Sequence, residues 1–149
     1  MILELKQGIA RELKKMYPNT PVYFNSTQQG TNPPCFYIFK IQKPQARGVN
    51  KRRYYLIQFD IIYCIEDALT DNESQLIEVS DKLDSIDTFD YMVKEGNQWV
   101  SKGVINIIDT TDDINDNELH YKINCRLDYL LEESNEKVED TEYELKGAE

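Results

Sequence analysis

The sequence contains few of the residues that enzymes and metal-binding proteins use for chemistry. Its 149 residues include one histidine, His120, and three cysteines, Cys35, Cys64 and Cys125. The spacings CxxC and HxxxH are absent, which argues against a zinc site, and so are the phosphate-binding patterns GxxxxGK[ST] and GxGxxG. An odd number of widely spaced cysteines argues for free thiols in a reducing compartment. We therefore predict that the protein is not an enzyme and has no metal and no cofactor.

Long apolar segments are also missing. No run approaches the roughly 20 apolar residues that a transmembrane helix needs. The opening MILELKQGIARELKKMYP has neither the apolar stretch nor the small-residue cleavage site of a signal peptide. We expect a cytosolic protein that does not enter membranes.

Acidic residues are absent from one long segment, between Leu13 and Phe59. Residues 1–59 hold ten Lys/Arg against two acids, a net charge of +8, whereas residues 60–149 hold seven Lys/Arg against 25 acids, a net charge of −18. The two parts sum to the −10 of the whole chain. Such a division is typical of a charged interaction surface, and equally of one fold whose two faces neutralise each other.

Apolar residues at helical spacing predict two helices. In residues 2–16 they recur every three or four positions, and Pro18 ends the pattern. Asn72 and Gln75 resemble a capping box at the start of a second helix, which we expect to reach residue 86.

Alternating apolar residues predict the strands. The sequence indicates strands at 35–43, 53–65, 99–109 and 119–131, a short β-like piece at 21–24, and a hairpin in which FDYMV pairs with 99–109. The expected fold is α+β, with a mainly antiparallel sheet covered on one face by two helices. We expect one domain over residues 1–131.

The side chains with possible chemistry fall on different faces of this sheet. Alternation places His120 on the exposed polar face of its strand and Cys125 on the apolar face, so the two do not form a catalytic pair. The stretch TDDINDNE does not have the spacing of an EF-hand, and we interpret it as a solvated acidic loop.

The segment KPQARGVNKRR, residues 43–53, concentrates positive charge between two predicted strands. We expect a long basic hairpin loop with Gly48 and Asn50 in the turn. Its cations could bind nucleic acid, with Tyr54 and Tyr55 stacking on bases, but a net charge of −10 repels a polyanion. An acidic protein partner is the better match. The candidate interface residues are Arg47, Lys51, Arg52 and Arg53.

The chain resembles the tail terminator, or tail completion, proteins of long-tailed bacteriophages and prophages. The residues that carry the resemblance are ILELKQGIARELKKMYPNTPVYF, PPCFYIFKIQKPQARGVNKRRYYLIQFDIIYC, ESQLIEVSDKLDSI and HYKINCRLDYLL, which together extend over residues 1–131. The resemblance implies an α+β structural protein of the virion tail, assembled in the cytoplasm of the host bacterium.

The resemblance also implies the partners. Proteins of this kind form a homo-oligomeric ring, commonly a hexamer, which caps the tail tube protein and docks to the head connector. The alternative hypothesis is a nucleic-acid-binding accessory protein that uses residues 43–53. Residues 132–149, with eight acids and two lysines, match no part of the pattern, and we expect a flexible acidic tail.

Overall fold

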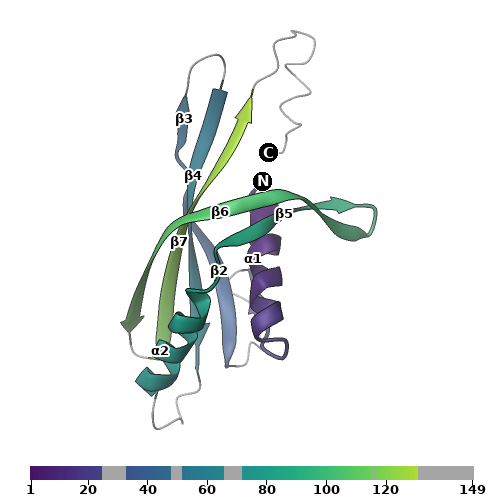
Figure 1. Cartoon of the computed structure of the whole chain (residues 1–149). Helices are drawn as coiled ribbons and strands as arrows, with labels where there is room; N and C mark the ends of the chain where they lie inside the picture. Colours follow the sequence, from purple (N-terminus) through teal and green to yellow (C-terminus); the bar gives the residue numbers. More distant parts are fainter. Residues whose placement is uncertain (25–32, 48–51, 66–71, 116, 131–149) are drawn as a thin grey trace.

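The computed structural model describes residues 1–24, 33–47, 52–65, 72–115 and 117–130. It confirms the predicted α+β class (Figure 1). The two helices in these ranges are α1 (Ile2–Met16) and α2 (Asn72–Leu83). The strands are β1 (Val22–Tyr23), β2 (Cys35–Gln42), β3 (Gln45–Arg47), β4 (Arg52–Cys64), β5 (Thr88–Glu95), β6 (Gln98–Asn115) and β7 (Glu118–Leu130).

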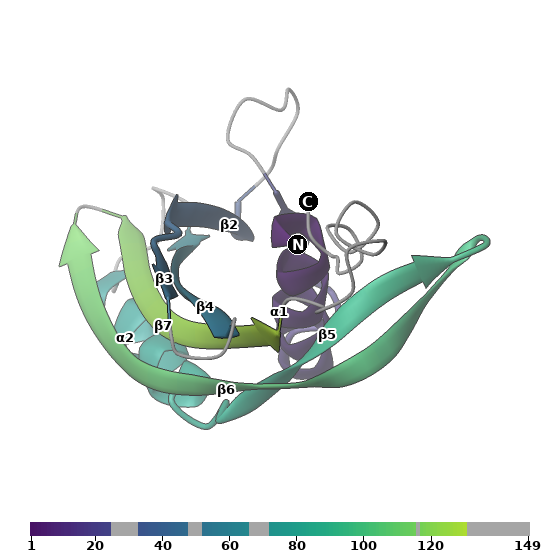
Figure 2. The same cartoon turned by 90° about the horizontal axis from the view of Figure 1, so that it is seen from above.

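The described strands form one 7-stranded sheet in the order β1-β2-β4-β7-β6-β5, with β3 also paired to β4. Only β1 and β2 run parallel among the described pairs; the others are antiparallel. The long strand β6 pairs with β5 near its start and with β7 near its end. Seen from above, β6 curves around the sheet, and the β5–β6 hairpin projects beyond α1 as an arm (Figure 2).

The buried core follows from the alternation in the central strands. Ile57, Phe59 and Ile61 of β4 are almost fully buried, and they face the same side as Tyr121 and Ile123 of β7. Both helices add their apolar stripes to this core. The stripe residues are Leu5, Ile9 and Leu13 in α1 and Leu76, Val79 and Leu83 in α2.

The helix α1 approaches β5 very closely at one point. A Cβ atom built on Gly8 would overlap the backbone carbonyl of Asp90 and lie 3.0 Å from Cδ2 of Phe89. Glycine is therefore the residue that allows α1 and β5 to pack with their backbones in contact. This packing fixes α1 against the base of the projecting hairpin.

Two sequence predictions are corrected. The segment from Thr111 to Asn115 continues β6 and pairs with β7, so the predicted acidic loop is mostly strand. Its carboxylates lie along a curved strand edge where water still solvates them. The second helix ends at Leu83 rather than at residue 86.

Among the described residues, neither helix is long and apolar enough to cross a membrane.

Candidate assembly surfaces

The basic segment forms a strand pair where we predicted a long loop. Strand β3 begins at Gln45, and Arg47 pairs with Arg53 in the antiparallel ladder. The predicted turn residues Gly48 and Asn50 lie outside the described residues, as does Lys51. Arg53 is half-buried and takes part in contacts with other groups. Arg52 follows on β4, with its backbone paired to Leu130 of β7.

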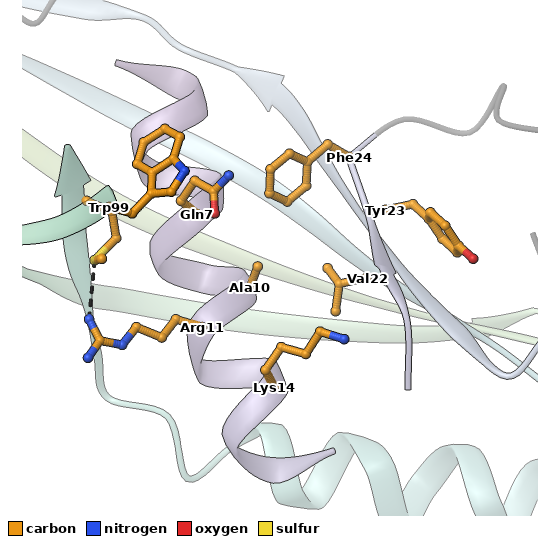
Figure 3. Close-up of a pocket in the computed structure, with 9 residues that line it drawn as sticks. Gln7, Ala10, Arg11, Lys14, Val22, Tyr23, Phe24 and Trp99 are labelled. Carbon is orange, nitrogen blue, oxygen red and sulfur yellow. Dashed lines mark hydrogen bonds between the residues drawn. The ribbon is translucent and has the colours of Figure 1, made fainter. Parts of the chain in front are cut away.

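A groove of about 650 Å³ opens between α1, β1 and the β5–β6 hairpin (Figure 3). Apolar side chains from all these elements form much of its surface. Val22 and Phe24 point toward α1 from β1 and the residue after it (Figure 3). The lining residues are Gln7, Ala10, Arg11, Lys14, Val22, Tyr23, Phe24, Met92 and Trp99. None of them carries a negative charge.

Two cations of α1 reach this groove with weak local partners. Nη1 of Arg11 lies 3.4 Å from a carboxylate oxygen of Asp90 and 3.5 Å from the sulfur of Met92. Nζ of Lys14 donates to the backbone oxygen of Thr20 at 3.2 Å. A long, half-exposed ion pair such as Arg11–Asp90 adds little stability, so both cations remain able to bind an anionic group.

A third cation stands beside the groove. Lys6 donates to the backbone oxygen of Phe24 at 3.0 Å and lies over its ring. Burial, with a smaller effect from the nearby Lys40, lowers the pKa of Lys6. The ammonium groups of Lys6 and Lys40 therefore repel each other.

The outer side of α2 has the opposite character. Ile77 is exposed, with 46% of its surface accessible. Glu73 and Asp81 are also exposed and stand four residues before and after it, so the three share one face of the helix. This acidic face, defined by Glu73, Ile77 and Asp81, is exposed and flanks the stripe that α2 buries.

The face of the sheet away from the core carries aromatic side chains. Tyr37 and Phe39 alternate with the buried Phe36 and Ile38 along β2. The rings of Tyr37 and Phe39 stack with their centres 6.0 Å apart. On the neighbouring strands the guanidinium of Arg126 lies 3.9 Å from the ring centre of Tyr54. Further exposed apolar residues are Ile41, Leu56, Val104 and Ile108.

We predicted that His120 is exposed on the polar face of its strand, but the structure places it between two carboxylates. Its Nδ1 lies 2.8 Å from Asp60 and its Nε2 lies 3.0 Å from Glu118. Burial alone would lower the pKa of His120, but the hydrogen bonds and charges of the two carboxylates outweigh it and raise the pKa. Asp60 is buried on β4, two positions from Ile62, which is the residue that pairs with His120 on β7. The cluster therefore joins the two central strands.

The cysteines show no sign of activation. Cys125 is buried in the core, as predicted, and burial raises the pKa of its thiol to about 12. Burial, together with the adjacent Glu118, raises the pKa of Cys64 to about 12 as well. A reactive cysteine needs a lowered pKa. Within the described ranges, no three His, Cys, Asp or Glu side chains gather to hold a metal ion.

Sequence reasoning found the basic segment but not the groove. The groove combines α1 with β1, β5 and β6, which lie up to 92 positions apart along the chain, from Gln7 to Trp99. The one available signal was the absence of acids from Leu13 to Phe59, a segment that includes Lys14 and residues 22–24, and the charge count noted it without locating a surface.

Comparison with known proteins identifies the family. No curated protein matches the chain. A family model described as phage tail terminator protein matches residues 4–139. That match extends over most of the sequence and agrees with the α+β fold and with the resemblance found in the residues. The chain therefore belongs to the phage tail terminator protein family, a structural component of the virion tail that interacts with other tail and head components.

Proposed function

We propose that the protein closes the tail tube as a homo-oligomeric ring, a hexamer, which stops growth of the tube and forms the surface that docks to the head connector. The observation that carries the proposal is the family match over residues 4–139. Its role is structural and not catalytic, and it assembles in the host bacterial cytoplasm.

The distribution of charge supports a ring. A ring needs a heterologous interface, in which one patch of a subunit meets a different patch of its neighbour. The chain has a basic part, residues 1–59, and an acidic part, residues 60–149. Charges of opposite sign on two patches orient the subunits, while apolar contacts supply most of the affinity.

The basic strand pair is a candidate contact in this assembly. We propose that Arg47, Lys51, Arg52 and Arg53 meet an acidic surface of the neighbouring subunit or of the tail tube. Because Arg53 is half-buried and already engaged, its replacement would also disturb the fold. The cleaner test therefore changes the other three residues.

The experiment assembles tail tubes with the variant Arg47→Glu/Lys51→Glu/Arg52→Glu. We expect a folded protein that fails to cap, so that tubes seen by electron microscopy exceed their normal length. The control variant Arg47→Lys/Lys51→Arg/Arg52→Lys keeps the charge and should cap normally. Normal tube lengths with the glutamate variant would exclude this contact. If the parent protein instead binds DNA in a salt-sensitive manner and the variant does not, the nucleic-acid hypothesis takes its place.

A further inference from the structure

We propose that the acidic face of α2 in one subunit seats in the groove beside α1 of the next subunit, so that the chain binds a second copy of itself head to tail. The inference rests on the proposed ring and names the surfaces that would join its subunits. The acidic face consists of Glu73, Ile77 and Asp81, and the groove is the one between α1, β1 and the β5–β6 hairpin.

The groove has the chemistry to receive such a face. Val22, Phe24, Met92 and Trp99 provide apolar surface, and Arg11 and Lys14 place cations among them. No carboxylate stands among the lining residues. An occupant with an apolar side chain flanked by carboxylates would bury that side chain in the groove. Its carboxylates would pair with Arg11 and Lys14.

The acidic face of α2 offers that combination. A single exposed isoleucine on a surface is ordinary and by itself indicates nothing. Ile77, however, has an acidic residue one helical turn away on either side, which matches cations around an apolar groove. The charge complementarity of these two patches is the argument for a second copy as the occupant.

The two patches lie on different elements of the same chain. Ile77 is exposed and is not among the residues that line the groove, so the two patches do not meet within the described part of one copy. Each copy can therefore use its acidic face toward one neighbour and its groove toward the next. Contacts of this heterologous type repeat around a closed ring when the rotation between subunits allows it.

The experiment uses two charge-reversed variants of the full chain. The groove variant is Gln7→Glu/Lys14→Glu, which makes the groove acidic. The helix variant is Glu73→Lys/Asp81→Lys, which makes the outer face of α2 basic. We expect each variant alone to lose self-association in sedimentation velocity across a range of concentrations, because its two patches then carry charges of the same sign.

The equimolar mixture of the two variants should recover association. The acidic groove of the first variant then meets the basic helix of the second, and the basic groove of the second meets the acidic helix of the first. Alternating subunits satisfy every contact in an even-numbered ring such as a hexamer. Recovery on mixing is a result that misfolded variants would not produce.

Two single changes complete the test. Ile77→Ser should weaken self-association by about tenfold or more if this side chain is the buried anchor of the contact. Lys15→Glu makes the same charge change as Lys14→Glu in the same turn of α1, but at a residue outside the groove lining, and it should leave association unchanged.

The outcomes separate this inference from the proposed function. If the parent chain associates and both reversed variants associate equally well, the inference is overturned and the ring proposal stands. If the parent chain stays monomeric with and without tail tubes, both are overturned. If Gln7→Glu/Lys14→Glu lowers the melting temperature while the mass remains that of the parent, the groove binds a segment of its own chain, and the inference is again overturned.

Discussion

Gly8 of α1 lies against the backbone carbonyl of Asp90 in β5 with no room for a side chain between them. Two opposing effects decide what happens when Gly8 becomes alanine. Alanine favours a helix over glycine by about 1 kcal/mol. Overpacking against backbone, which cannot rotate away, costs about 1–3 kcal/mol.

We expect the second effect to dominate, so that Gly8→Ala lowers the free energy of unfolding and the melting temperature. The measurement is urea unfolding followed by circular dichroism. Gly103→Ala is the matched control, because a Cβ at Gly103 meets no atom within 4 Å. A Gly8→Ala protein as stable as its parent would show that α1 and β5 are less tightly packed than the structure has them.

The His120 cluster predicts a specific dependence of stability on pH. The pKa of His120 in the folded chain is raised above its ordinary value of 6.5, because hydrogen bonds to Asp60 and Glu118 outweigh the effect of burial. The folded state therefore holds the proton more tightly than the unfolded state. The resulting stabilisation is complete below pH 6.5 and is lost as the pH rises through the raised pKa.

His120 is the one histidine in the chain, so its titration can be followed by NMR without ambiguity. We expect a midpoint above 6.5, and we expect His120→Gln to remove this part of the pH dependence of unfolding. A midpoint at or below 6.5 would mean that the two carboxylates do not hold the ring in solution.

The cysteines should react slowly with thiol reagents in the folded protein. Cys35 and Cys125 are buried, and the pKa of Cys64 is raised to about 12 although its side chain is partly accessible. Because the thiolate is the reacting form, few of these groups are reactive at pH 8. Ellman's reagent should count three thiols in denaturant and react with them far more slowly in buffer. Rapid reaction of Cys64 in buffer would contradict the assigned environment.

The acidic C-terminal residues should contribute little to folding. We propose that residues 1–131 form the domain and that residues 132–149, with eight acids, have few apolar side chains to pack. Truncation after Glu133 should therefore change the melting temperature little in a thermal scan. A large decrease would show that this segment binds to the domain.

Local patterns predicted those parts of the fold that depend on neighbours in sequence. The alternation in residues 53–65 and 119–131 gave the core faces of β4 and β7, because one buried face imposes a period of two. The prediction of a loop at the acidic end of β6 was wrong, because solvated carboxylates are as compatible with an edge of a curved strand as with a loop. Strand β3 was missed because it has only three residues, follows Pro44 and shows no alternation of apolar side chains.

The candidate sites were harder to predict because they depend on register and packing between distant segments. His120 meets Asp60 only because β4 and β7 align them in neighbouring positions. The groove lies where α1 packs beside β1 and the β5–β6 hairpin, and Gly8 allows the close approach of α1 to β5. Neither the contact of His120 with Asp60 nor the packing of α1 on β5 has a signal in any short stretch of sequence. The basic segment, in contrast, was visible from its composition alone.

The pairing of β4 with β7 has a consequence for synthesis of the protein. Their ladder joins Cys64 to Glu118 and Arg52 to Leu130, separations of 54 (118 − 64) and 78 (130 − 52) residues. On the ribosome, β4 emerges long before the strand that lies beside it at the centre of the sheet. The sheet can close only once β7 has left the exit tunnel, and contacts of such long range form slowly. A subunit of the proposed ring can therefore complete its sheet only after β7 has been synthesised.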